Sequence, residues 1–165
     1  LLCQLLIYQQ AAPILIDEDA ARLEFARSCG IYYTMTTDEH LLEGIASLTG
    51  GRLVSGAVYM TSAQRNAPAI PFSVCANGAN VVLCGSRDDF DVNFSQPFRK
   101  ELSVFCVSGR SENLEAAINL IVRGAVDVSS FSFRTVRSDD TEKFLADYFR
   151  SPDRDFKEIN VVTLI

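Results

Sequence analysis

The sequence predicts an α/β fold with a doubly wound, mostly parallel sheet. Segments with strand character alternate with segments of helical periodicity from Ile14 to Ile165, and the connections are long enough to cross between parallel strands. The strand segments are short apolar runs, which is typical of strands covered by helices on both faces. An acidic residue, Asp17, directly follows the first of these runs. Ligands of open α/β sheets bind beyond the carboxyl ends of the strands, so this carboxylate is predicted to face a nucleotide.

Composition indicates one globular domain, or a domain with a tail. The chain has 165 residues, of which 48% are hydrophobic and 22% charged, and this is the range of proteins with a packed core. The net charge of -6 argues against nucleic acid or an anionic membrane as a partner, because phosphate groups would be repelled. No run approaches the roughly twenty apolar residues of a membrane span.

The five cysteines are spread along the chain without a C-x-x-C pair, and His40 is the one histidine. This pattern predicts neither a disulfide framework nor a zinc site within the chain. Free cysteines in apolar segments indicate a reducing, cytoplasmic location. His40 lies early in a predicted helix, where it is expected to be solvated, and no residue is assigned a catalytic role.

The first segments predict a helix, a strand and a second helix. Leu2, Leu5 and Leu6 share one helical side within residues 1–10. Residues 13–17 form the first strand, and Asp19 is then positioned to cap a helix that Gly30 ends. The packing side of that helix is predicted to consist of Leu23, Phe25, Ala26 and Cys29. Two roles stay open for Asp17: accepting hydrogen bonds from a ribose diol, or stabilising the amino end of the helix through its dipole.

The middle of the chain predicts three strands and two helices. A strand at residues 31–35 precedes a helix that Thr36 and Glu39 would start as a capping box, with Gly50 and Gly51 ending it. The apolar positions of this helix are Leu41, Leu42, Ile45 and Leu48. A strand follows at residues 54–60, then a polar loop and a short helix at 70–75. Asn77-Gly78 is predicted to turn the chain into a buried strand at 79–85.

The last third predicts two strands and two helices after a strand that runs from Leu102 to Val107. Residues 86–96 are interpreted as a solvated loop before that strand. Ser111 would cap the helix with the strongest apolar periodicity, which is carried by Leu114, Ala117, Ile118, Ile121 and Val122. A strand at 131–136, a helix that starts at residues 138–140 and ends before Pro152, and a strand at 157–165 complete the chain.

The spacing Asp17-x4-Arg22-Leu23-x2-Ala26-x3-Gly30 resembles the segment after the second strand of the medium-chain dehydrogenase/reductase family, which includes the zinc-type alcohol dehydrogenases. Further stretches resemble motifs of that family in the same order, at residues 48–51, 78–85, 99–102 and 114–124. The resemblance covers nearly all of the chain. It implies a Rossmann-like NAD-binding domain over residues 1–128, followed by a return segment over residues 129–165 toward a catalytic domain.

The resemblance also implies how a cofactor would be held. Asp17 would accept the hydroxyls of the adenosine ribose and favour NAD over NADP, whose extra phosphate it would repel, with Arg22 near the same ribose. The other implied cofactor-binding residues follow later strands: Met60 and Thr61 beside a ribose, Cys84, Gly85 and Ser86 near the nicotinamide, and Val107 and Ser108 at its carboxamide. Structural roles stay open for several of them: Arg22 as a solvated helix residue, Cys84 and Val107 as core residues, and Ser86 and Ser108 in turns.

The chain also departs from the family pattern. The glycine-rich G-x-G-x-x-G turn and the first strand are absent, and so are the catalytic domain and its zinc ligands. Because the first strand is usually central, the strands at 13–17 and 54–60 are expected to lack their shared neighbour. Asn160, Ala63 and the pair Ser55-Gly56 stand where the family often has charged residues. The simplest interpretation is the C-terminal part of a longer polypeptide.

The leading hypothesis is the NAD-binding portion of an alcohol or polyol dehydrogenase, in which zinc would be held by the missing catalytic domain. Alone, the chain is expected to have no dehydrogenase activity. An S-adenosylmethionine-dependent methyltransferase-like domain remains an alternative, because such folds also end their second strand in an acid. A non-catalytic interaction domain that has lost its cofactor is a third. Family resemblance also suggests a homodimer through the uncharged strand from Leu102 to Val107.

Overall fold

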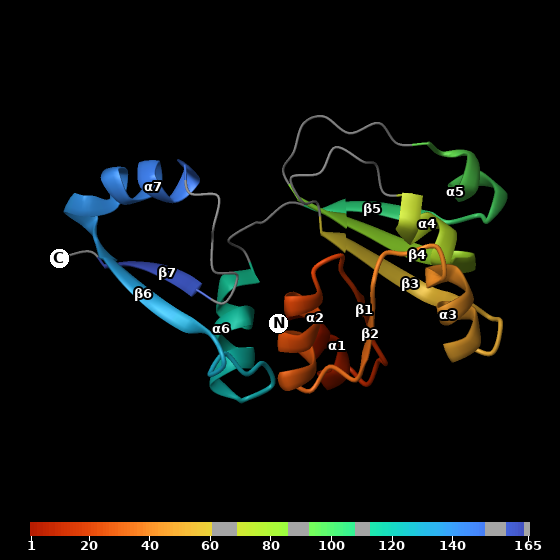
Figure 1. The fold of residues 1–165 in the computed structure, drawn as a ribbon, viewed down its shortest axis with the longest axis horizontal. Coiled ribbons are helices and arrows are strands. Elements are labelled where there is room, and N and C mark those ends of the chain that lie inside the picture. The colour runs from red at the N-terminus through yellow and green to blue at the C-terminus, as the bar shows by residue number, and fades with distance from the viewer. Residues whose placement is uncertain (61–68, 86–92, 108–112, 151–157, 164–165) are drawn as a thin grey trace. The chain divides into compact units, whose positions relative to one another are not determined.

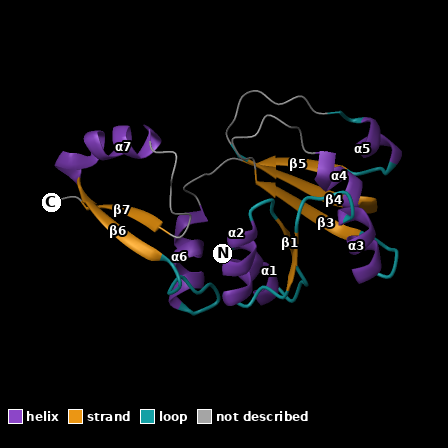
Figure 2. Cartoon of the chain, viewed as in Figure 1, coloured by secondary structure: helices purple, strands orange, loops and turns teal. Residues whose placement is uncertain are grey.

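The structure, a computed structural model, describes residues 1–60, 69–85, 93–107, 113–150 and 158–163 (Figure 1). Helices and strands alternate along these residues, as Figure 2 shows by colour. Every strand pairing among them is parallel, so the predicted Rossmann-like α/β class is confirmed. The chain forms two compact units, one of Leu1–Thr36 with Glu115–Ile165 and the other of Thr37–Leu114.

The unit of Thr37–Leu114 contains a three-stranded sheet in the order β3-β4-β5. Its elements are α3 (Leu41–Leu48), β3 (Val54–Met60), α4 (Ala69–Val74), β4 (Cys75–Cys84), α5 (Ser95–Arg99) and β5 (Ser103–Val107). Strand β4 is the central strand, and its buried positions alternate with more exposed ones from Ala79 to Leu83. Parallel strands of this kind need crossover connections, and α4 and α5 lie in those connections.

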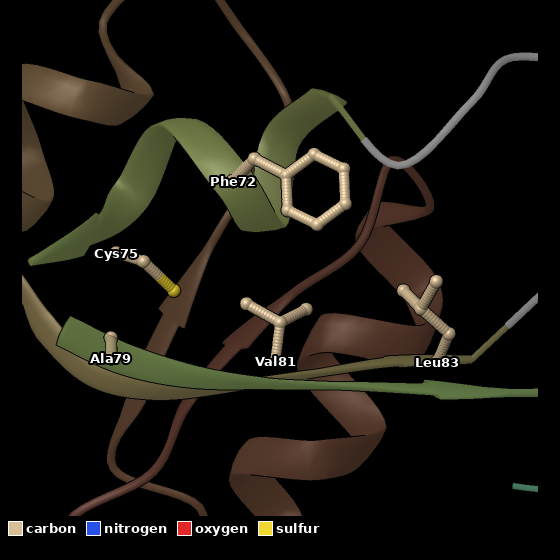
Figure 3. Close-up of a cluster of buried hydrophobic side chains, with 5 residues drawn as sticks. All are labelled: Phe72, Cys75, Ala79, Val81 and Leu83. Carbon is tan, nitrogen blue, oxygen red and sulfur yellow. The ribbon is translucent and has the colours of Figure 1, made fainter. Parts of the chain in front are cut away.

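The core of this unit forms where α4 covers one face of β4. Ala79, Val81 and Leu83 project from the same face of the strand toward Phe72 (Figure 3), because alternate residues of a strand share a face. Cys75 completes the cluster. Burying a side chain as large as Phe72, which is 2% exposed, contributes about 1.5–3 kcal/mol to folding.

Lys100 joins α5 to the end of α4. Its Nζ donates hydrogen bonds to the backbone oxygens of Phe72, Ser73 and Cys75 at 3.1, 2.7 and 2.8 Å. The last carbonyl groups of a helix have no partner within the helix. The ammonium group therefore satisfies the carboxyl end of α4 and lies at the favourable end of its dipole.

The other unit contains two separate pairs of parallel strands. Its elements are α1 (Leu2–Tyr8), β1 (Ile14–Ile16), α2 (Ala20–Ser28), β2 (Tyr33–Met35), α6 (Leu114–Val122), β6 (Ser132–Arg137), the 3-10 helix η2 (Ser138–Asp140), α7 (Thr141–Arg150) and β7 (Glu158–Thr163). Among the described strands, β1 pairs only with β2, and β3 of the other unit pairs only with β4.

Helix α2 packs as its sequence predicts. Leu23 and Ala26 are buried, and the ring of Phe25 meets the edge of Phe131 at a centroid distance of 5.3 Å. Arg27 ties the helix to β2 through a 2.8 Å hydrogen bond from its Nε to Thr34 Oγ1. Gly30 has a φ of 83°, which is the left-handed conformation expected of a glycine after a helix.

The predicted capping box at Thr36 and Glu39 is wrong, because α3 begins five residues after Thr36, at Leu41. The residue before it, His40, makes no side-chain capping hydrogen bond. Asp38 Oδ1 instead accepts the backbone N–H of His40 at 2.9 Å, so the chain turns around Asp38 before the helix starts. Within α3, Leu41 and Ile45 are buried as expected, whereas Leu42 and Leu48 are exposed.

The predicted turn at Asn77-Gly78 is also wrong, because β4 already begins at Cys75. Cys75 pairs with Val54, and the register then shifts before Gly56 pairs with Asn80. Gly78 has a φ of 73°, and its N–H donates to the Lys100 oxygen at 2.7 Å. The Asn-Gly pair therefore forms an irregularity inside a long strand.

The helical prediction for α6 is confirmed, but its apolar side chains are not buried among the described residues. Leu114, Ile118, Ile121 and Val122 are all exposed. Its predicted cap, Ser111, lies outside the described residues.

Candidate functional site

Asp17 lies directly beyond the carboxyl end of β1. Its backbone N–H donates to the Met35 oxygen of the parallel neighbour β2 at 3.2 Å, so the residue is held against the sheet. Its side chain is 26% exposed, and Oδ1 accepts the backbone N–H of Asp19 at 2.9 Å. The carboxylate is therefore oriented by the backbone and remains accessible to a ligand.

Asp19, rather than Asp17, caps helix α2. Asp19 Oδ1 accepts the N–H groups of Ala21 and Arg22 at 2.8 and 3.4 Å, which is the usual role of an N-cap carboxylate. These are the groups at which a carboxylate meets the positive end of the helix dipole. The capping hydrogen bonds of α2 are thus accepted by Asp19, and both roles proposed for Asp17 from the sequence stay open.

Arg22 pairs with both of these carboxylates. Its Nη1 lies 3.6 Å from Asp17 Oδ2, and its Nε lies 3.5 Å from Asp19 Oδ2. The guanidinium is about half exposed, with a side-chain exposure of 52%. Arg22 is therefore a partly solvated helix residue whose guanidinium lies beside the carboxylate beyond β1.

The arrangement around Asp17 suits recognition of a neutral diol. A carboxylate accepts hydrogen bonds and cannot donate them when ionised, so neighbouring hydroxyl groups of a ribose match its free lone pairs. The two carboxylates and one guanidinium carry a formal charge of -1 together. An additional phosphate on that ribose would meet net negative charge.

A second group of implied site residues lies along the carboxyl edge of the other unit's sheet. Met60 of β3 pairs with Cys84 of β4 in the strand register, and Cys84 pairs with Val107 of β5. The three residues therefore form one row across the ends of three parallel strands. Met60 and Val107 are exposed and Cys84 is partly buried, so neither end of the row belongs to the core.

Gly85 directly follows this row. Its N–H donates to the Val107 oxygen at 3.3 Å. This carbonyl group, which was expected to bind the carboxamide, therefore already accepts one hydrogen bond within the protein. A carbonyl oxygen has a second lone pair and can accept another hydrogen bond. Thr61, Ser86 and Ser108, the residues next to the strand ends in the sequence, lie outside the described residues.

The sequence predicted Asp19 only as a helix cap and did not predict its ion pair with Arg22. Asp19 and Arg22 are three residues apart, at a spacing that brings side chains together on a helix, and this signal could have predicted their ion pair. The row of strand ends required the register, which the sequence does not specify. The row and Asp17 belong to different compact units.

No three His, Cys, Asp or Glu side chains among the described residues are grouped so that they could hold a metal ion. The donor set in this part of the chain therefore does not fit zinc, and no chemical step is assigned to a metal. None of the described helices is long and apolar enough to span a membrane.

Parallel strands flanked by helices, with an oriented carboxylate beyond a strand end, define the chain as a Rossmann-like domain of the nucleotide-binding class. Residues 1–123 match the zinc-binding dehydrogenases. The chain belongs to this family, and it corresponds to the nucleotide-binding part of a medium-chain dehydrogenase/reductase. A comparison with curated proteins found no match.

Solved structures with the same fold include alcohol dehydrogenases and enoyl reductases. A zinc-dependent alcohol dehydrogenase 2 from Streptococcus pneumonia is 20% identical, with a TM-score of 0.70 over 96% of this chain and 48% of that one. The enoyl reductase JamJ is 15% identical, with a TM-score of 0.67 over 98% and 50%. An alcohol dehydrogenase from E. coli CFT073, in complex with the cofactor NADH, is 17% identical, with a TM-score of 0.63 over 90% and 44%. The chain spans about half the length of these proteins.

Proposed function

We propose that this chain is the NAD-binding part of an oxidoreductase that transfers hydride between an alcohol or polyol and nicotinamide. The observation that carries the proposal is the Asp17 carboxylate, which is oriented by the Asp19 N–H at the carboxyl end of a parallel strand. Membership in the zinc-binding dehydrogenase family supports the reaction class. When bound, NAD supplies the hydride acceptor, and the residues of this chain hold and orient it.

The residues around Asp17 fit this cofactor by their chemistry. Asp17 offers acceptors to the ribose hydroxyls, and Arg22 partly balances its charge from 3.6 Å. Within the unit of Thr37–Leu114, Met60, Cys84 and Val107 form a row of strand ends with both outer members exposed, as expected of a cofactor-binding edge of that sheet. The preference for NAD over NADP follows from the negative charge that an extra phosphate would meet at Asp17.

A binding experiment on the natural full-length protein tests the role of Asp17. We expect Asp17→Asn to weaken NADH binding about tenfold, because the amide keeps an acceptor for the Asp19 N–H but binds hydroxyl donors less strongly than a carboxylate. Titration calorimetry with NADH measures the change. S-adenosylmethionine serves as the second titrant, because binding of that compound in place of NADH would favour the methyltransferase alternative.

Asp127→Asn is the matched control for this experiment. Asp127 also accepts a backbone N–H two residues later, from Ser129 at 2.8 Å, but it follows no described strand. We expect its substitution to leave NADH binding unchanged. Equal affinities for NADH in the natural protein and in Asp17→Asn would contradict the proposed role of Asp17. Absence of NADH binding by the natural protein would favour the non-catalytic alternative.

We also propose that the protein forms a homodimer through β5. Within the described residues this strand pairs only with β4, so its outer edge offers unpaired backbone groups to a second copy.

Five free cysteines support the further proposal of a reducing, cytoplasmic compartment.

A further inference from the structure

We propose that Asp19 is a positioning residue that strengthens the preference for NAD over NADP, because it holds the Arg22 guanidinium between two carboxylates. This inference rests on the proposed function and concerns the same end of the cofactor. Asp17, which would face the ribose, would then not determine the preference for NAD over NADP alone. Asp19 would contribute to it through Arg22.

The two oxygens of Asp19 have separate partners. Oδ1 accepts the N–H groups of Ala21 and Arg22 at 2.8 and 3.4 Å, which fixes the carboxylate on the first turn of α2. Oδ2 then lies 3.5 Å from Arg22 Nε. The helix cap thus orients the oxygen that meets the guanidinium.

Arg22 is shared between the acids through different nitrogen atoms. Nη1 lies 3.6 Å from Asp17 Oδ2 while Nε faces Asp19. A guanidinium is a planar group with donors in a fixed arrangement, so holding Nε restricts where Nη1 can lie. Asp19 would therefore help to hold the positive charge beside Asp17, where two carboxylates compete with a ribose phosphate for it.

The charge of the cluster leads to the same conclusion. Asp17, Asp19 and Arg22 carry a formal charge of -1 together. Without the charge of Asp19, the remaining pair is neutral and Arg22 has one carboxylate partner fewer. A ribose phosphate, which carries about two negative charges, would then meet less repulsion and a more available guanidinium.

Asp19→Asn separates this role from helix capping, because an asparagine side chain retains the capping oxygen and loses the charge. In the natural full-length protein, the Kd ratio of NADPH to NADH is expected to fall about fivefold, as the removal of one nearby charge predicts. Arg22→Gln should raise the same ratio. The measured quantities are dissociation constants from titration, so no substrate is required.

Glu24→Gln is the matched control, because Glu24 also pairs with an arginine of α2, Arg27, at 2.6 Å. It removes one negative charge from the same helix, and we expect it to leave the ratio unchanged. The difference between the natural protein and Asp19→Asn should shrink at high salt, because these charges are exposed to solvent. A purely structural role would not produce this salt dependence.

The outcomes distinguish this inference from the proposed function. An unchanged ratio in Asp19→Asn, with NADH binding intact and sensitive to Asp17→Asn, would overturn the role of Asp19 alone. Equal loss of affinity for both cofactors would also overturn it, because it would indicate a structural effect. Absence of NADH binding by the natural protein would overturn the proposed function and this inference together.

Discussion

Cys75 is a buried thiol beside a positive charge, and these two features act on its pKa in opposite directions. The side chain is 0% exposed, and burial raises the pKa of the Cys75 thiol because the thiolate would lose its hydration. The ammonium group of Lys100 lowers this pKa in part. The net shift is upward, so the folded protein favours the neutral thiol.

This shift predicts a loss of stability at alkaline pH. The pKa of Cys75 is higher in the folded than in the unfolded state, so its contribution is fully present below the unfolded value and is lost as pH rises through the folded value. The free energy of unfolding should therefore start to fall as pH passes the ordinary thiol pKa and keep falling until pH exceeds the higher pKa of the folded Cys75 thiol, by at most about 1.4 kcal/mol per pH unit from this group. Urea unfolding at several pH values measures the slope.

Cys75→Ala should make that slope shallower even though the substitution lowers stability at every pH. Cys106→Ala serves as the control, because Cys106 is exposed and should leave the slope as it is. Identical slopes in the natural protein and in Cys75→Ala would show that the thiol does not contribute.

At the scale of elements, Lys100 is the connection between α4 and α5. Its ammonium group donates to the backbone oxygens of Phe72 and Ser73 in α4 and of Cys75 at the start of β4, and hydrogen bonds of charged donors contribute more than neutral ones. Lys100→Met keeps most of the apolar stem and removes these donors. We expect the free energy of unfolding to fall by about 2 kcal/mol, because partly buried carbonyl groups lose their partner.

Lys143→Met is the control for this substitution. Lys143 is an exposed residue of α7, and surface substitutions usually change stability by less than about 0.5 kcal/mol. Urea midpoints of both variants provide the comparison. Equal midpoints for Lys100→Met and the natural protein would mean that water replaces the ammonium group at α4 without cost.

The sequence predicted most elements because their signals are local. The apolar run Val54–Met60 gave the bounds of β3 directly, and Asp19 and Gly30 marked both ends of α2. The misplaced boundaries lie where two local signals compete. Asp38 uses its side chain in a turn before α3, and Gly78 lies inside a strand whose pairing partner is more than twenty residues away in sequence.

The candidate site was predictable only where one residue carries the chemistry. The sequence places Asp17 directly after a strand, and the structure confirms that it follows β1. The ion pairs of Arg22 with Asp17 and Asp19 depend on side-chain orientation. The alignment of Met60, Cys84 and Val107 depends on the register of the strands. Neither side-chain orientation nor register follows from hydrophobic periodicity, which predicts the buried face of a helix or strand but not the residues that it contacts.

At the scale of the whole molecule, charge and strand edges determine which partners are compatible. The net charge of -6 opposes binding to nucleic acid or to an anionic membrane. It does not oppose pairing through β5, because the residues from Ser103 to Val107 carry no charge. Among the described strands β5 pairs only with β4, and an apolar strand with an open edge would invite uncontrolled association, so the proposed pairing with a second copy is a defined way to cover it.

Phe105 provides the substitution that tests this dimer. It is 52% exposed on β5, and a lysine there would place one positive charge from each copy next to the shared edge, where like charges repel. We expect Phe105→Lys to weaken dimerisation of the natural protein at least about tenfold, as measured by sedimentation velocity over a range of concentrations. Phe98→Lys is the matched control, because Phe98 is 81% exposed on α5 and should leave the dimer intact. A natural protein that stays monomeric at high concentration, or a Phe105→Lys variant as dimeric as the control, would contradict pairing through β5.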